Sequence, residues 1–225
     1  MAPQDQIKVL AICYGMLFLL CLWAWKMKSE NLVSQKVLNG NWLLLHVRHA
    51  GGVFIMTVLP VLFLPVVPVR VFLWPGSVDH IQTLALMITA LILLILVVKN
   101  REGLSIGRTA YQKGSSFHAM LHIVLRSSFL VSYEWFFRGC ILFSCIDLFG
   151  TIPAIIINLV LYALIHSFNG KKEMYGSVPF GLMLCLFTIW YQSVWPAILL
   201  HLLLSSSHES FLLSPFLCKK IKPVL

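Results

Sequence analysis

Glu134 and Arg138 stand one helical turn apart inside one of the most apolar stretches of the sequence. A charged side chain at the centre of a membrane span costs about 2.5–3.5 kcal/mol on insertion scales, so such a pair indicates a function. His166 ends a later apolar run, and His201 is followed one turn later by Ser205 in another. A carboxylate and two imidazoles can activate a water molecule and stabilise an oxyanion, or can bind a divalent metal that does both. These residues therefore predict a polar cavity for hydrolysis within the membrane.

The composition is that of an integral membrane protein. Of its 225 residues 59% are hydrophobic and only 11% are charged, whereas a soluble domain carries roughly 25% charged residues. The net charge of +9 is interpreted as lysines and arginines that flank membrane spans, so no nucleic-acid partner is expected. The six cysteines form no CxxC pair, which argues against a disulfide framework or a thiolate zinc site.

The apolar runs predict an all-α, polytopic helix bundle of about seven spans, the last four of which form the catalytic core. No cleavable signal peptide is expected, so the first apolar run is taken as a retained span. The predicted spans cover residues 8–25, 51–69, 80–98, 127–147, 150–168, 175–192 and 196–214. Two weaker runs, Leu38–Val47 and Gly114–Arg126, are predicted to be interfacial helices.

The distribution of lysine and arginine sets the expected orientation. If the segments 26–50, 99–126, 169–174 and 215–225 face the cytoplasm, they hold fourteen basic residues, against two on the opposite side. The N-terminus is then outside and the C-terminus in the cytoplasm. We expect three parts: N-terminal spans and loops over 1–115, a catalytic core over 116–214, and a basic tail over 215–225.

Short connections make antiparallel neighbours, so the turn at 147–153 predicts that the helices on either side of it pack together. At about 1.5 Å per residue, Glu134 and His166 then lie at nearly the same depth. By the same rise, His201 lies roughly 12 Å too high to meet them if its span starts near Trp195.

Three motifs resemble those of the CPBP family of intramembrane endopeptidases, the CAAX proteases and bacteriocin-processing proteins, also called Abi. The resemblance covers roughly residues 116–210. The family motifs are Glu-Glu-x-x-x-Arg, Phe-x-x-x-His and His-x-x-x-Asn or Ser. The corresponding segments here are Tyr133-Glu134-Trp-Phe-Phe-Arg138, Tyr162-Ala-Leu-Ile-His166 and His201-Leu-Leu-Leu-Ser205.

The resemblance implies a hydrolase that cuts a membrane-proximal peptide bond in a lipidated or membrane-tethered protein or peptide. Glu134 is implied as the base and His166 as the residue that helps to position its water. His201 and Ser205 are implied to stabilise the oxyanion, and Arg138 to have a structural role. The resemblance also implies a glutamic peptidase without a metal; if a metal such as zinc were bound, Glu134, His166 and His201 would be its ligands.

Tyr133 departs from the family pattern, because it stands where the first glutamate is usually assigned the main water-activating role. Three interpretations follow. Glu134 acts as the sole base; or the chain belongs to a bacterial branch with a single glutamate that acts on C-terminal sorting signals; or the protein is an inactive membrane scaffold that binds partner spans. The small size favours a prokaryotic enzyme of the inner or cell membrane.

Other interpretations of the same residues are structural. Glu134 and Arg138 can be an ion pair that holds a bundle together, and His201 with Ser205 can join helices. His118 and His122 share one helical face and could be metal ligands, but they are interpreted as part of an interfacial helix near the headgroups; His208-Glu209 is interpreted as a solvated pair. A proton-coupled transporter is disfavoured because no inverted repeat with interrupted helices is evident.

Overall fold

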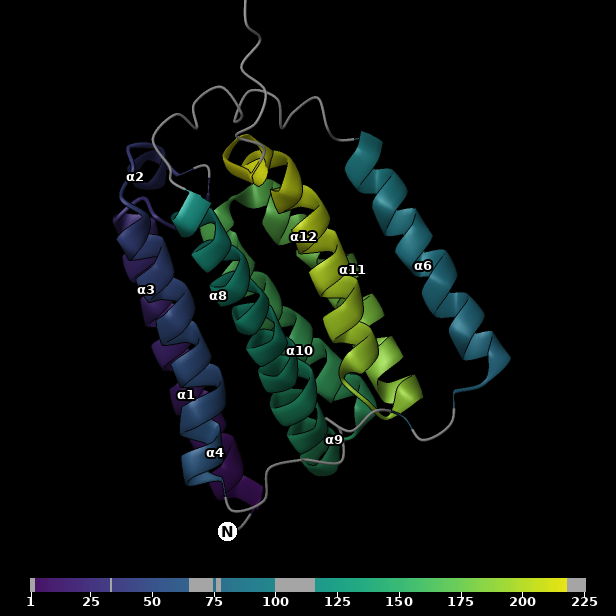
Figure 1. Ribbon diagram of the computed structural model, residues 1–225. Coiled ribbons are helices and arrows are strands. Elements are labelled where there is room, and N and C mark those ends of the chain that lie inside the picture. The colour runs from purple at the N-terminus through teal and green to yellow at the C-terminus, as the bar shows by residue number, and fades with distance from the viewer. Residues whose placement is uncertain (1–2, 33, 65–74, 76–77, 100–115, 218–225) are drawn as a thin grey trace, which may run out of the picture.

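The computed structural model describes residues 3–64 except 33, residue 75, and residues 78–99 and 116–217. Within these ranges the protein is a bundle of helices without strands. Six of the described helical segments are long and apolar enough to cross a membrane, against about seven predicted, and the predicted span 196–214 is not among the six. The prediction of an all-α polytopic bundle is therefore confirmed (Figure 1).

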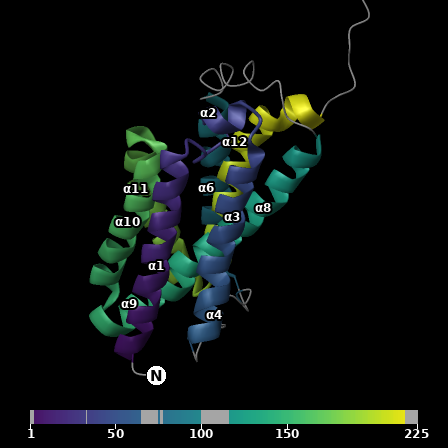
Figure 2. The same ribbon diagram turned by 90° about the vertical axis from the view of Figure 1, so that its left-hand side faces the viewer.

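The N-terminal part contains a helix pair. Helix α1 (Pro3–Lys26) is followed by the short α2 (Gln35–Leu38) and by α3 (Trp42–Val53), which continues through the π-helical η1 (Phe54–Val58) into α4 (Leu59–Phe63). In Figure 2, α1 lies between α10 and α11 on one side and α3 and α8 on the other. The hydroxyl of Tyr14 in α1 donates a hydrogen bond to the Leu161 carbonyl at 3.0 Å, which ties α1 to α10.

The prediction of an interfacial helix over Leu38–Val47 is wrong for most of its length. Residues 42–63 form one continuous span, so this span begins nine residues before the predicted 51–69, whose residues 65–69 lie outside the described residues. The physical reason is burial: Trp42 and Leu45 pack against Ala119 of α8, and the polar side chains that follow them, His46, Arg48 and His49, are buried in the protein interior. They lower the hydropathy of the helix without placing it at the headgroups.

The longest helix runs through the centre of the molecule. Helix α8 (Ser116–Glu134), the π-helical η2 (Trp135–Leu142) and α9 (Phe143–Phe149) form one continuous element of 34 residues. The prediction that Gly114–Arg126 is a separate interfacial helix is therefore wrong over its described residues. His122 in this part is 1% exposed, so its polar character again reflects a buried contact and not a membrane surface.

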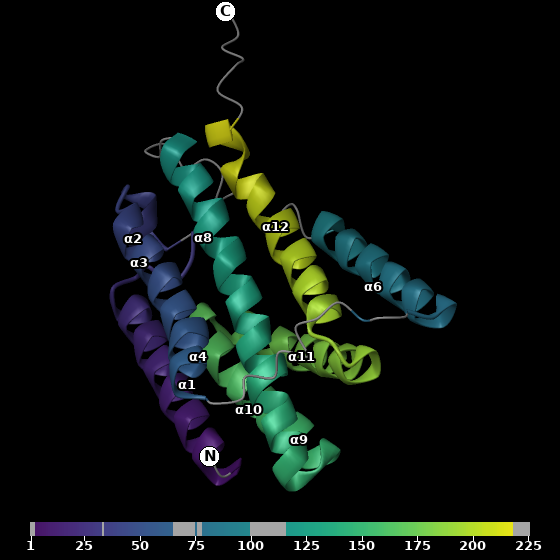
Figure 3. The same cartoon turned by 60° about the horizontal axis from the view of Figure 1, so that its bottom comes forward.

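The core is completed by α10 (Thr151–His166), the 3₁₀ turn η3 (Ser167–Asn169), α11 (Lys171–Tyr191) and α12 (Trp195–Leu217). Gly150 has φ +83°, a conformation that favours glycine, and it turns the chain sharply between α9 and α10. Helices α8 and α12 lie side by side and antiparallel (Figure 3). Helix α6 (His80–Lys99) lies at the side of the bundle against α12 (Figure 1), with most of its apolar side chains exposed, as expected of a surface that faces lipid.

The expected 12 Å mismatch of His201 does not occur. Val194, just before α12, is fully buried, packs in one cluster with Phe143, and lies 3.5 Å from the position a Cβ would take on Gly139. The start of α12 is therefore level with residues 139–143 and not with the turn at Gly150. That places it about 10–15 Å deeper than the sequence argument assumed, by the helical rise per residue.

Candidate active site

Polar side chains cross the interface between α8 and α12 at three levels. His201 pairs with Glu134, Ser205 with Arg126, and Glu209 with both Arg126 and His122; the atoms joined are as follows. The Nδ1 of His201 is 2.5 Å from the Oε1 of Glu134. The Nη2 of Arg126 is 3.3 Å from the Oγ of Ser205, and its Nε is 3.1 Å from the Oε1 of Glu209. The Nε2 of His122 is 3.2 Å from the Oε2 of Glu209. The spacing of His201, Ser205 and Glu209 at every fourth residue places all three on one face of α12.

Glu134 lies between two partners and has no contact with solvent. Its Oε2 is 3.2 Å from the Nη1 of Arg138, its Oε1 is 2.5 Å from the Nδ1 of His201, and both Glu134 and Arg138 are 0% exposed. The predicted ion pair between Glu134 and Arg138 is thus present. The Arg138 guanidinium also lies 4.1 Å from the centre of the Tyr162 ring, a cation–π contact. Two cationic or hydrogen-donating partners fix the carboxylate in place.

A π-helix begins immediately after Glu134. The wider turns of η2 (Trp135–Leu142) leave a buried carbonyl at Phe137, which accepts a 2.6 Å hydrogen bond from the Nδ2 of Asn158 in α10. The Sγ of Cys185 in α11 donates in turn to the Oδ1 of Asn158 at 3.3 Å. π-Helical turns occur frequently at functional sites. Here Asn158 of α10 is hydrogen-bonded to both η2 and α11, and so holds in place the helical segment that orients Glu134 and Arg138.

His166 and His201 meet around two tyrosine rings. The Tyr162 ring lies 4.6 Å from the His166 ring and 6.5 Å from the His201 ring, centre to centre. The Tyr133 ring lies 6.3 Å and 6.0 Å from the same two rings. The Nε2 of His166 is buried and has no hydrogen-bond partner among the described residues. The two predicted histidines, from α10 and α12, are therefore close together.

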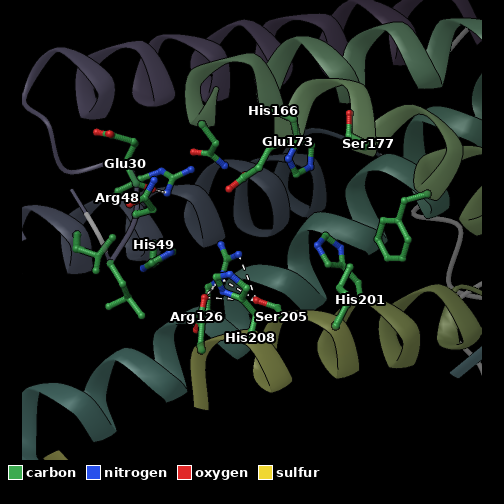
Figure 4. Close-up of a pocket in the computed structure, with 18 of the residues that line it drawn as sticks. Glu30, Arg48, His49, Arg126, His166, Glu173, Ser177, His201, Ser205 and His208 are labelled. Carbon is green, nitrogen blue, oxygen red and sulfur yellow. Dashed lines mark hydrogen bonds and ion pairs between the residues drawn. The ribbon is translucent and has the colours of Figure 1, made fainter. Parts of the chain in front are cut away.

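Both histidines line a cavity of about 570 Å³ between α3, α8, α10, α11 and α12 (Figure 4). Ser205 and Tyr162 line it as well, whereas Glu134, Arg138 and Tyr133 do not. The sequence led us to expect Glu134 at the cavity surface. Instead it lies behind His201, which is the group that connects it to the cavity.

This arrangement determines the chemistry that His201 can perform. An ionised carboxylate only accepts hydrogen bonds. The nitrogen of His201 that faces Glu134, Nδ1, must therefore carry the proton of the neutral imidazole. The Nε2 of His201 then keeps its lone pair and can accept a proton from a group in the cavity. A carboxylate that orients an imidazole in this way is a recurring device of hydrolases.

Tyr133, which replaces the family's first glutamate, is 3% exposed. Its ring stacks on Phe137 at 4.4 Å between centres, and its hydroxyl has no hydrogen-bond partner among the described residues. The position therefore places an aromatic ring, and no carboxylate, beside the two histidines.

The sequence analysis gave no role in the site to several other residues that line the cavity. They are Arg48 and His49 from α3, His122 and Arg126 from α8, and Glu209 from α12. The interpretations of His122 as interfacial and of Glu209 as half of a solvated pair with His208 are wrong, because Glu209 pairs instead with His122 and Arg126. The one-turn spacing of His122 and Arg126 was the available signal, but only the packing of α8 on α12 shows what they contact.

The described residues contain no group of three or more His, Cys, Asp or Glu side chains arranged to hold a metal ion. Glu134, His166 and His201 do not form one. Both oxygens of Glu134 are engaged, one by the Arg138 cation and one by the Nδ1 of His201, and a metal would have to displace these partners. The side chains as arranged do not fit a metal centre.

Residues 116–207 match the family described as type II CAAX prenyl endopeptidase, Rce1-like. The matched segment contains Glu134, Arg138, His166, His201 and Ser205, and it confirms the family resemblance inferred from the three motifs. Comparison with curated proteins and with solved structures gave no match. The match supports an intramembrane peptidase of the CAAX type.

Proposed function

From the premise that residues 116–207 belong to the type II CAAX prenyl endopeptidase family, we propose that the protein hydrolyses a membrane-proximal peptide bond in a lipidated or membrane-tethered protein or peptide. A prenylated C-terminal peptide is the first substrate to test. The observation that carries the proposal is that His201 and His166 line one cavity while the buried Glu134 holds the Nδ1 of His201.

In the proposed reaction, a water molecule in the cavity attacks the carbonyl carbon of the scissile bond while the Nε2 of His201 takes one of its protons. Glu134 is a positioning residue: it orients the imidazole and stabilises the imidazolium that forms. When the carbon–nitrogen bond breaks, His201 returns the proton to the leaving amine. This differs from the sequence-based expectation, in which Glu134 acts on water directly, because a fully buried carboxylate does not reach the cavity.

The remaining polar groups are proposed to stabilise the oxyanion. The Nε2 of His166 is buried without a hydrogen-bond partner among the described side chains, and the Tyr162 ring contacts the rings of both His166 and His201. The Ser205 hydroxyl accepts from Arg126, which leaves its own proton to be donated; its partner at present is the Oε1 of Glu209 at 3.4 Å, a long bond. The reaction proposed here uses no metal, since the donor set around Glu134 is already occupied.

Four residues that line the cavity support an orientation. Glu30 and Asn31 lie in the loop that follows α1, whereas Asn169 lies in η3 and Glu173 in the first turn of α11. Lysines lie near them along the chain: Lys26, Lys28, Lys36, Lys171 and Lys172. Lysines next to spans favour the cytoplasmic side. We therefore propose that the substrate enters from the cytoplasm.

Tyr133 supports the second candidate, an inactive membrane scaffold that binds partner spans in the same cavity. The experiment that separates the two uses the purified protein in nanodiscs with a prenylated CAAX peptide, and detects products by mass spectrometry. His201→Gln and His166→Ala are compared with Lys172→Gln, an exposed residue that does not line the cavity. Cleavage by the wild type and Lys172→Gln, with about 10²–10⁴-fold loss in the histidine variants, supports the peptidase. Binding of the peptide without cleavage by the wild type supports the scaffold.

A further inference from the structure

Arg48 presents a buried charge without a counter-ion among the residues that the structure describes. It belongs to α3, is 5% exposed and lines the same cavity as His201. Its Nη1 donates to the backbone carbonyl of Glu30, its guanidinium carbon lies 5.9 Å from the centre of the Phe129 ring, and its Nε is buried without a hydrogen-bond partner in the described part of the chain. No carboxylate of the described residues forms an ion pair with it. A guanidinium taken out of water in this way is costly unless an anion pairs with it.

The acidic residues around the cavity do not supply that anion. Glu209 pairs with Arg126 and Glu134 with Arg138. Glu30 and Glu173 line the cavity, but the structure gives neither an ion pair with Arg48, and the Glu30 carboxylate lies away from the Arg48 guanidinium (Figure 4).

His49, the next residue along α3, presents a second unsatisfied group to the same cavity. It is 1% exposed and lines the cavity, and its Nδ1 is buried without a hydrogen-bond partner among the described residues. Its ring is fixed edge-on against His122, with 5.3 Å between the ring centres. An anion beside Arg48 and His49 would complete the hydrogen bonds of both residues.

We propose that Arg48 and His49 form a seat for a carboxylate of the peptide substrate, and that this seat holds the peptide in the cavity while His201 acts on it. This proposal rests on the proposed function for its substrate. A planar guanidinium matches the two oxygens of a carboxylate. The cavity also carries the carboxylates of Glu30 and Glu173, which repel a doubly charged phosphate more strongly than a singly charged carboxylate. Arg48 and His49 lie in α3, outside the family-matched segment 116–207, so the family match does not itself supply the seat.

The test compares two peptides that differ only at the chain end, a prenylated CAAX peptide with a free C-terminal carboxylate and the same peptide as a carboxamide. Equilibrium binding is measured by fluorescence anisotropy in phosphatidylcholine nanodiscs. The background is His201→Gln, so that hydrolysis does not interfere and a failure of the proposed activity does not hide a result at the seat. Arg48→Gln, Arg48→Lys and the control Lys172→Gln are added to that background.

The seat predicts that the carboxylate peptide binds about ten- to a hundredfold more tightly than the carboxamide, the range expected for a hydrogen bond to a charged group. Arg48→Gln should bring this ratio close to one, Arg48→Lys should leave an intermediate ratio, and Lys172→Gln should leave it unchanged. Because no carboxylate of the described residues pairs with Arg48, Arg48→Gln breaks no ion pair, and a cooperative unfolding transition close to that of its parent shows that the variant is folded.

Equal binding of the two peptides by the parent protein would overturn the proposal, as would a preference that survives Arg48→Gln. If the parent shows no preference but retains phosphatidylglycerol more strongly than Arg48→Gln does, the anion at Arg48 is a lipid headgroup and the peptide seat is refuted. Failure of the wild type to cleave either peptide would refute the proposed function alone, since the binding ratio is measured without turnover.

Discussion

Removing the charge of Glu134 should destabilise the protein strongly, and removing Arg138 as well should restore most of the stability. Glu134→Gln keeps the size and the hydrogen-bonding capacity of the side chain but leaves the Arg138 guanidinium, which is 0% exposed, without its only carboxylate partner among the described residues. Breaking one half of a buried ion pair costs about 3–5 kcal/mol. The single variant should lose that amount of unfolding free energy.

The double variant Glu134→Gln/Arg138→Met removes both charges and fills the space with an apolar chain of similar length. Replacing a buried pair in this way is often neutral or stabilising. The variant also loses the 4.1 Å contact of the guanidinium with the Tyr162 ring, worth about 2 kcal/mol when desolvated. Its stability should therefore lie within about 2 kcal/mol of the wild type, while peptide cleavage stays lost because His201 has no carboxylate behind it.

The assay is thermal unfolding in detergent micelles, followed by tryptophan fluorescence, with Lys172→Gln as the exposed control. The reasoning fails if Glu134→Gln unfolds at the wild-type temperature, because the pair would then contribute nothing. It also fails if the double variant is less stable than the single one, or if the double variant recovers cleavage.

Three further predictions concern the elements that position the site. Asn158→Leu should lower stability by about 1–3 kcal/mol, because it removes the buried hydrogen bond from the Nδ2 of Asn158 to the Phe137 carbonyl. The same variant should lower the cleavage rate, measured by product mass spectrometry, by moving Glu134. Gly52→Ala should lower the free energy of unfolding by about 1–3 kcal/mol in the same thermal assay, because the added Cβ would lie 2.3 Å from the Cε2 of Phe129. The control Gly15→Ala, where no atom lies within 4 Å of the added Cβ, should be neutral or stabilising. Incubation with EDTA or phenanthroline should leave the cleavage rate unchanged, because both oxygens of Glu134 are already held by Arg138 and His201; loss of activity that zinc restores would contradict the metal-free reaction.

The sequence was sufficient to predict the helical bundle and the common depth of Glu134 and His166, but its helical rise placed His201 about 12 Å too high to meet them. Each of these residues is a polar interruption of an apolar helix, and such interruptions must face the protein interior. The same logic misplaced the starts of α3 and α8. Arg48, His49, His122 and Arg126 lower the local hydropathy as loop residues would, although they line a cavity inside the bundle.

Two features of the site depend on packing that no local pattern encodes. The depth of His201 depends on how far the start of α12 is inserted beside Gly139 and Phe143. The position of Glu134 behind His201, instead of at the cavity surface, depends on that same insertion and on the π-helical turn that Asn158 holds. The motif spacing along each helix is unaffected by either feature, which is why it predicted the residues but not their arrangement.

The most direct test of the account is a double-mutant cycle on kcat for cleavage of the prenylated peptide, with Glu134→Gln, His201→Gln and the combination of both, each at matched folded concentration. If Glu134 acts through His201, the two residues work as one unit, and the double variant should be no slower than the slower single variant. Multiplied losses in the double variant, or cleavage by His201→Gln at a rate near that of the wild type while Glu134→Gln is inactive, would contradict it.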